Sequence, residues 1–291
     1  MKLGLINLAA VLAALVLGGV LSAGGAALES RPSASEGERS IADVGGHEVA
    51  VRRYARIASA STIADQVLAE IAEPSRVVAI AAHTRRIART PWRYEGKAEV
   101  PRLDDREELL ALDPDLVLAS GFADPGQVAR LRRAGLTVFD LGPMHGVESL
   151  LEDIRTLGAL IDEPERGERF AVQFERRLRH VSAGLAGQER VGGLYVGAFG
   201  DQLYGGARGT SYADILEAAG VVDVASAAGI EGWPAYRIEQ LLELDPTWIV
   251  TPAERASALC RHPGLDHLSA CREDRVAVPY RHRTLPTVPP G

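Results

Sequence analysis

The sequence predicts an α/β protein of two lobes, each with a mainly parallel sheet, joined by a long helical segment. Short β-branched runs alternate with amphipathic stretches over residues 56–140 and again beyond residue 187, whereas residues 147–183 carry no strand signal. Such alternation is typical of parallel sheets with helices on both faces. A helix-turn-strand segment also occurs twice, which indicates that the two lobes share a structural unit.

Composition is that of a globular chain with a sizeable core. The 291 residues are 46% hydrophobic and 24% charged, and this length suggests two domains of ordinary size. The formal net charge is -7, so the chain has no general attraction to phosphate backbones or anionic membranes, and nucleic acid is not an expected partner.

The N-terminus has the layout of a secretory signal peptide, which we place at residues 1–27. Lys2 precedes an apolar run from Leu3 to Leu21, and small residues follow. The run is just long enough to span a bilayer, so an uncleaved membrane anchor is the alternative. No cysteine stands at the end of the run, which excludes a lipoprotein anchor at this signal. We therefore expect a periplasmic or extracytoplasmic protein, membrane-tethered if the signal stays uncleaved.

Residues 28–40 are predicted to be a flexible leader, because Ser, Glu, Arg and Pro leave little to bury. The first lobe is expected over residues 41–145. Ser61 or Thr62 caps its first helix, and Gly135 closes its last one. Its predicted strands are 56–59, 76–80, 116–119 and 137–140, its later helices are 106–112 and 125–134, and residues 82–100 are expected to form a loop.

Residues 146–186 are expected to connect the lobes, as one long helix or as two helices end to end around Pro164. Leucines and isoleucines recur there at helical spacing. The second lobe is expected over residues 187–291. Its predicted strands are 193–197, 248–251 and 275–278, and its predicted helices are 212–219 and 236–244.

The repeat is the most informative pattern. Residues 107–119 and 239–251 align without a gap, at an offset of 132 residues (239 minus 107). This spacing is too long for a solenoid unit. Two sheets that face each other would place the carboxyl ends of their strands, where α/β sheets bind ligands, around a shared cleft.

The chain has two cysteines, Cys260 and Cys271. An exported chain meets an oxidising compartment, where an isolated pair forms a disulfide. The alternative is a metal site that adds His262 and His267, for which the sequence supplies no geometry.

Several segments resemble the periplasmic binding proteins for cobalamin, ferric siderophores and heme. The resemblance runs from about residue 41 to residue 278. It implies two Rossmann-like lobes held by one rigid backbone helix, a ligand cleft between the lobes, a monomer without its own cofactor, and a partner ABC permease dimer with its ATPase. The motifs are Leu-Asp-Pro-Asp-Leu-Val at 112–117, a Gly and Ser/Thr pattern ending in Ala-Gly at 206–220, Trp-Pro at 233–234, and residues 239–246. The proline-rich end at 287–291 departs from the family, whose last sheet a helix usually covers.

By position, the resemblance implies that Glu107 and Glu239 meet arginines of the permease dimer. Such pairing would fix the docking register and speed the encounter. The alternative is a solvated acid, since a carboxylate in the first turn of a helix is favoured by the helix dipole in any case.

The expected ligand site combines aromatic and basic side chains from both lobes. Aromatic rings offer a stacking surface to a flat porphyrin, corrin or catecholate, and guanidinium groups pair with carboxylates. For heme, the resemblance places a tyrosine near Tyr94, with His83 as the second candidate iron donor. Alternatively, the arginines only keep a loop soluble, and Tyr94 is a lid residue. The candidates are His83, Arg85, Arg86, Trp92 and Tyr94 in the first lobe, and Tyr204, Arg208, Trp233 and Tyr236 in the second.

An enzyme is not expected, because the chain lacks the nucleophile elbow, the phosphate-binding loop with its lysine, and the His-Glu-x-x-His zinc motif. The seven histidines are scattered, so direct capture of a small metal ion is not indicated. The remaining alternative is an exported receptor that signals its ligand without transport.

Overall fold

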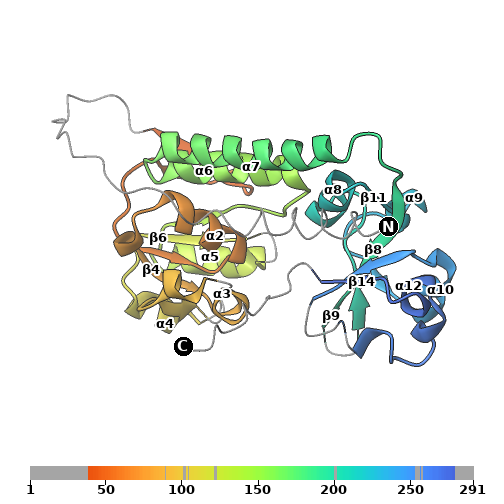
Figure 1. Cartoon of the computed structure of the whole chain (residues 1–291). Helices are drawn as coiled ribbons and strands as arrows, with labels where there is room; N and C mark the ends of the chain where they lie inside the picture. Colours follow the sequence, from red (N-terminus) through yellow and green to blue (C-terminus); the bar gives the residue numbers. More distant parts are fainter. Residues whose placement is uncertain are drawn as a thin grey trace, which may run out of the picture. The chain divides into compact units, whose positions relative to one another are not determined.

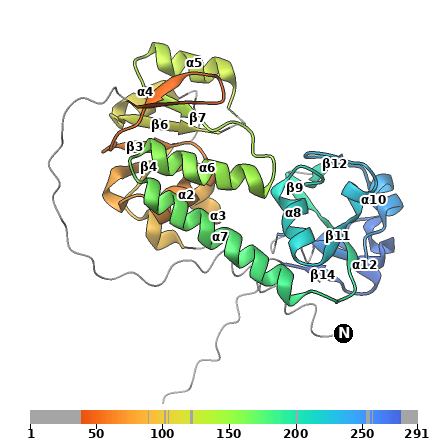
Figure 2. The same ribbon diagram turned by 90° about the horizontal axis from the view of Figure 1, so that it is seen from above.

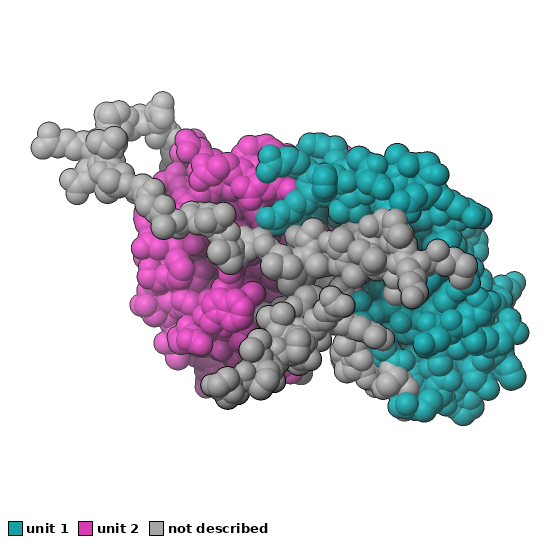
Figure 3. Space-filling view, viewed as in Figure 1, with its two compact units in different colours: residues 1–18, 145–147, 174–291 teal, residues 19–144, 148–173 magenta. Residues whose placement is uncertain are grey.

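The computed structural model describes residues 39–278 except 89, 101, 102, 104, 121, 122, 200, 201, 253–255 and 257, and it leaves the side chain of Phe199 undescribed. The predicted signal peptide, most of the leader and the proline-rich end lie outside the described residues. The described chain forms two compact units (Figures 1 and 3). Unit 2 runs from residue 39 to Met144 and from Glu148 to Gln173, and unit 1 takes His145–Val147 and the chain from Phe174 onward.

Unit 2 is built on a five-stranded sheet in the order β5-β4-β3-β6-β7, and every pairing in it is parallel. The sheet is short-stranded and buried on both faces, as expected for strands between two helical layers. Its strands are β3 (Ile57–Ser59), β4 (Val77–Ala81), β5 (Ala98–Val100), β6 (Leu116–Ala119) and β7 (Val138–Asp140).

Alternate residues of these strands point into two separate cores. Leu116 and Leu118 pack with α2 (Thr62–Ile71), while Val117 packs with α4 (Arg106–Ala111) and α5 (Pro125–Arg133). Ser61 caps α2 as predicted, with its hydroxyl 3.3 Å from the backbone N of Ala64. The predicted fold class is thus confirmed for this unit.

An antiparallel hairpin of β1 (Ser40–Ala42) and β2 (Glu48–Ala50) precedes the sheet, and the sequence analysis did not predict it. Asp43 stabilises its turn, because Oδ1 accepts hydrogen bonds from the backbone N of Gly45 at 2.9 Å and of His47 at 3.0 Å. Such hydrogen bonds from nearby backbone N–H groups to an aspartate are typical of turns.

The helical segment consists of α6 (Val147–Leu160) and α7 (Pro164–Gly184). They do not lie end to end around Pro164. They fold back on each other (Figure 2), and a Cβ atom on Gly158 would lie 2.8 Å from the Cα of Gly167. Arg155 Nε also pairs with Glu168 Oε2 at 2.8 Å across the hairpin. α7 begins in unit 2 and ends in unit 1, so one helix links the two units along the chain.

Residues 82–100, expected to be a loop, are mostly ordered secondary structure. They comprise α3 (Ala82–Ile87), the 3₁₀ turn η2 (Pro91–Tyr94) and β5. The stretch escaped prediction because α3 buries a single residue, Thr84, and therefore has no apolar periodicity to detect.

Unit 1 has a four-stranded parallel sheet in the order β11-β8-β13-β14, and a small antiparallel sheet in the order β12-β10-β9. Tyr236, expected to begin a helix, lies instead in β12. The strands are β8 (Val191–Tyr195), β9 (Gly197–Phe199), β10 (Gln202–Tyr204), β11 (Val221–Asp223), β12 (Ala235–Tyr236), β13 (Trp248–Val250) and β14 (Val276–Ala277), and the helices include α8 (Ser211–Ala218), α9 (Val224–Ala227), α10 (Ile238–Leu244) and α12 (Ser269–Arg272).

The predicted disulfide between Cys260 and Cys271 is present, with a Cα–Cα distance of 5.4 Å. No helix among the described residues is both long enough and apolar enough to cross a membrane.

The two copies of the repeat form the same unit. α4 leads into β6, and α10 leads into β13, each an interior strand of its sheet. Asp113 and Asp245 end the helices in left-handed conformation, with φ of 47° and 31°, and a proline follows each of them and prevents the helix from continuing.

Candidate functional site

Unit 1 gathers aromatic rings at the carboxyl end of β8, whose last residue is Tyr195. The rings of Tyr195 and Tyr212 stack at a centroid distance of 3.8 Å and an interplanar angle of 23°. Trp233 meets Tyr212 edge to face at 5.4 Å. The outermost ring, Trp233, is 41% exposed, whereas Tyr195 and Tyr236 are buried. The cluster therefore exposes one indole ring to solvent, supported by the stacked tyrosine rings.

Three glycines allow tyrosine rings to lie directly against the backbone of this cluster. A Cβ on Gly205 would lie 2.4 Å from Cε2 of Tyr236, and a Cβ on Gly197 would lie 2.9 Å from Cζ of Tyr204. A Cβ on Gly206 would approach the ring of Tyr212 at 3.0 Å. A larger residue at these positions would displace a ring or the backbone.

The loop after β10 is held by backbone hydrogen bonds to the segment before β12. Gly205 N donates to Pro234 O at 3.0 Å, and Ala207 N donates to Gly232 O at 2.9 Å. Arg208 is exposed, and its Nη2 donates to Ser226 O at 3.0 Å. The two backbone bonds and the arginine bond together hold the loop beside Trp233.

Tyr236 carries an unusual hydroxyl. Its Oη is buried and has no hydrogen-bond partner among the described residues. Burial raises the pKa of Tyr236 above its ordinary value, and Asp223 adds to that rise. A buried neutral phenol is thus the state that this environment favours.

In unit 2, three of the predicted ligand residues are exposed, and two are held by contacts within the unit. His83 and Arg86 are exposed on α3, with Nη2 of the arginine 3.4 Å from Nδ1 of the histidine. Trp92, in η2, is 64% exposed. These three side chains are accessible to a ligand.

Arg85 is half-buried and paired, and Tyr94 is buried. Nε of Arg85 pairs with Glu99 at 2.7 Å, and Nη2 donates to Lys97 O at 2.5 Å. Tyr94 is 6% exposed within the core, where burial, with Asp65 adding to it, raises its pKa to about 12. Of the two predicted iron donors, the structure thus exposes His83 and buries Tyr94.

The predicted docking acids are both exposed. Glu107 is the second residue of α4, and Glu239 is the second residue of α10. Neither makes an ion pair with another of the described residues. Asp105 caps α4, its Oδ1 accepting from the backbone N of Glu108 at 3.3 Å.

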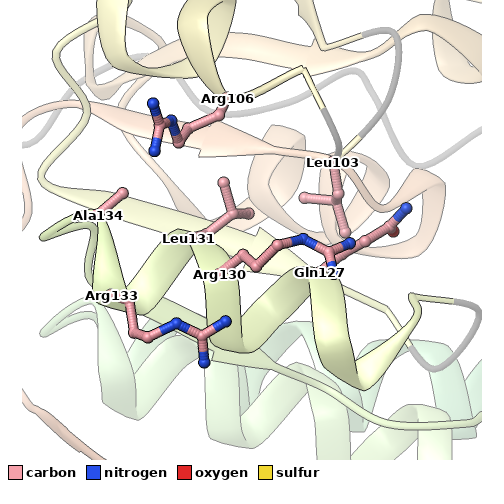
Figure 4. A pocket seen from close by; sticks show the side chains of 7 residues that line it. All are labelled: Leu103, Arg106, Gln127, Arg130, Leu131, Arg133 and Ala134. Atoms are coloured by element: carbon pink, nitrogen blue, oxygen red, sulfur yellow. The ribbon is translucent and has the colours of Figure 1, made fainter.

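Unit 2 also has a cavity of about 350 Å³ that contains none of the predicted ligand residues. Leu131 is part of its lining, and Figure 4 shows this side chain between Arg106 on one side and Arg130 and Arg133 on the other. Within the described part of the chain, no three His, Cys, Asp or Glu side chains are grouped so that they could hold a metal ion.

Comparison with known proteins decides the family. A family model described as "Periplasmic binding protein" matches residues 57–278. The chain belongs to this family. The resemblance noted in the sequence is therefore confirmed, as is the two-lobed α/β fold class.

Individual relatives are distant. A cobalamin-binding protein of Halobacterium salinarum is 23% identical over 197 residues, which are 67% of this chain and 53% of that protein. The chain thus spans about half the length of the curated relatives it matches. Among solved structures, a periplasmic heme-binding protein from Pseudomonas aeruginosa is 25% identical with a TM-score of 0.68, covering 77% of this chain and 84% of that one. The vitamin B12-binding protein BtuF of Vibrio cholerae is 22% identical with a TM-score of 0.64, covering 78% and 88%.

Two residues of the aromatic cluster, Tyr195 and Tyr212, were not predicted from the sequence. The two lie 17 residues apart (212 minus 195), on different elements, so no local pattern connects them. The glycines that face the rings, at 197, 205 and 206, were the available signal, because glycine marks close approach of a side chain to the backbone.

Proposed function

We propose that this periplasmic binding protein is the extracytoplasmic substrate-binding component of an ABC importer, and that it binds cargo rather than catalysing a reaction. The cargo is a large metal chelate: heme, a ferric siderophore or cobalamin. The observation that carries this proposal is the pair of exposed indoles, Trp92 at 64% and Trp233 at 41%, one in each unit. Distant relatives that bind heme and cobalamin support the same ligand class.

The exposed groups suit such a ligand. Indole faces stack on a macrocycle or a catechol ring, which explains why two large aromatics would stay in contact with water in the free protein. Arg86 and Arg208 offer guanidinium groups for carboxylates at the ligand's edge. The imidazole of His83 is a suitable donor to heme iron.

A titration with hemin, cobalamin and ferric siderophores tests the ligand class, with absorbance and tryptophan fluorescence as readouts. The chain has three tryptophans. Trp248 is the internal control, because it is half-buried beside Arg275, whose guanidinium carbon lies 5.9 Å from its ring centre. We expect Trp92→Phe and Trp233→Phe each to weaken binding and to reduce quenching, and Trp248→Phe to do neither. Binding of small metal ions or sugars alone would contradict the proposal.

Export is part of the proposed function, with the signal peptide at residues 1–27. N-terminal sequencing of protein purified from the cell envelope would give a mature start after Ala27. A start at Met1 in the membrane fraction would point to the tethered form instead.

Delivery is proposed to use Glu107 and Glu239 as contacts to the permease dimer. Reversal of both to Arg should abolish uptake of the identified ligand while its affinity for the binding protein stays unchanged. Glu165→Arg is the matched control, because Glu165 is also the second residue of its helix and its side chain is 90% exposed. If the double reversal weakened ligand affinity, the two acids would belong to the ligand site instead.

A further inference from the structure

An exposed leucine follows each proposed docking acid three residues later. Leu110 is 41% exposed on α4, and Leu242 is 37% exposed on α10. Their offset of 132 residues (242 minus 110) equals that of Glu107 and Glu239. Residues three apart are neighbours on a helix surface, so each helix presents an acid and a leucine side by side.

The two helices are seated in their units in the same way. Leu109 and Leu241, equivalent in the repeat, are each 1% exposed and anchor α4 and α10 in separate cores. The buried leucine and the aspartate that ends the helix occupy equivalent positions in both copies. The glutamate and the exposed leucine are therefore presented on the same side of each helix, away from its core.

Single exposed leucines are ordinary on protein surfaces and need no explanation. Their duplication does need one. The remaining positions outside the cores differ between the two helices, since Glu108 corresponds to Gln240 and Ala111 corresponds to Glu243. Leu110 and Leu242 each leave more than a third of their surface in contact with water. The shared exposed features of the two helices are therefore the acid and the leucine.

We propose that Leu110 and Leu242 are apolar anchors for the same partner that Glu107 and Glu239 meet, which rests on the proposed permease docking. The partner offers the same site twice, each with a basic group for the glutamate and an apolar depression for the leucine. A two-fold symmetric membrane protein has this property, because its subunits present identical surfaces.

The acid and the leucine have separable effects on docking. Charges raise the association rate and make it sensitive to salt, whereas a buried apolar contact mainly slows dissociation. Truncation of an anchor at an interface centre commonly costs a factor of about ten or more in affinity. We expect Leu110→Gln and Leu242→Gln each to raise the dissociation rate about tenfold at both low and high salt. Glutamine retains helix propensity and side-chain length, so both helices should stay intact.

The test measures association and dissociation rates of the full chain, loaded with the ligand found by titration, on its permease-ATPase complex in lipid nanodiscs. The matched control is Val172→Gln, because Val172 is 42% exposed on α7 and lies outside the repeat. Circular dichroism melting of each variant checks that it is folded. Faster dissociation for both leucine variants, and not for Val172→Gln, supports the inference.

Two other outcomes are distinct. If Glu107→Gln and Glu239→Gln weaken docking but the leucine variants behave like Val172→Gln, this inference is overturned and the proposed function stands. If the unaltered protein does not bind the complex at all, the proposed function fails and the inference fails with it.

Discussion

The hydroxyl of Thr84 donates a hydrogen bond to Oδ2 of Asp65 at 2.5 Å, deep inside unit 2. The same carboxylate oxygen accepts from the backbone N of Ala81 at 2.9 Å, while Oδ1 is buried and has no partner among the described residues. Asp65 is 1% exposed. One carboxylate thus ties α2 to the end of β4 and to the first turn of α3, the helix that carries His83 and Arg86.

Asp65→Asn should remove a pH dependence from the stability of unit 2. Burial raises the pKa of Asp65 to about 6, although Thr84, Ser59 and the backbone of Ala81 oppose the rise. A carboxyl whose pKa is raised on folding contributes stability below its unfolded pKa, and this contribution is lost as pH rises through about 6. As the pH rises from about 4 to about 6, the stability of the variant relative to the natural protein should therefore increase, by at most about 3 kcal/mol. Urea unfolding across this pH range measures the difference.

Asp65→Ala is the contrasting variant. It removes the charge but also the acceptor for Thr84 and Ala81, and a buried donor without a partner costs about 1–3 kcal/mol. It should be less stable than Asp65→Asn at every pH. A pH-independent difference between Asp65→Asn and the natural protein would contradict the raised pKa.

Gly158→Ala should destabilise unit 2, although replacement of glycine by alanine inside a helix ordinarily stabilises a protein. The added Cβ would lie 2.8 Å from the Cα of Gly167, so α6 and α7 would have to separate, at a cost of about 1–3 kcal/mol. Gly184→Ala is the control, because Gly184 ends α7 and a methyl group added there would meet no atom within 4 Å. There the same change should stabilise, by up to about 1 kcal/mol. Equal stability of the two variants in urea would show that the helix contact is not tight.

The sequence was informative wherever one element carries its own signal. In each repeat copy the acidic helix, the aspartate, the proline and the buried strand follow one another directly along the chain. Both copies could therefore be predicted from residues 107–119 and 239–251. The hairpin of α6 and α7 could not. Hydrophobic periodicity gives the helices, but the contact of Gly158 with Gly167 that brings them side by side is a matter of tertiary packing.

The candidate site was predictable by residue type but not by exposure. Arg85 and Arg86 are neighbours in the sequence, yet one is bound to Glu99 and the other is exposed, because successive residues of a helix point in different directions. Tyr94 and Trp92 likewise lie in the same short turn, one buried and the other open to solvent. Such differences depend on neighbours that are distant in the sequence.

Gly205→Ala should disturb the aromatic cluster of unit 1. The new Cβ would meet Cε2 of Tyr236 at 2.4 Å and the backbone O of Tyr195 at 2.9 Å, so the ring or the strand must move. We expect a loss of about 1–3 kcal/mol in unfolding free energy and a changed near-ultraviolet circular dichroism spectrum from the tyrosines. Gly184→Ala should leave that spectrum unchanged. An unchanged spectrum for Gly205→Ala would mean that the cluster is loosely packed.

Removal of the disulfide should weaken one part of unit 1. Cys260 and Cys271 close a loop at a sequence separation of 11, within which Leu265 and Leu268 are buried in the core. The chain-entropy relation gives about 3 kcal/mol for a loop of this length. Cys260→Ser combined with Cys271→Ser should lower the unfolding free energy by that amount, and the natural protein under reducing conditions should match the variant. Hydrogen exchange should rise over residues 256–278 and remain unchanged in the sheet of unit 2. If protection fell equally in both units, the bond would stabilise the whole chain rather than this loop.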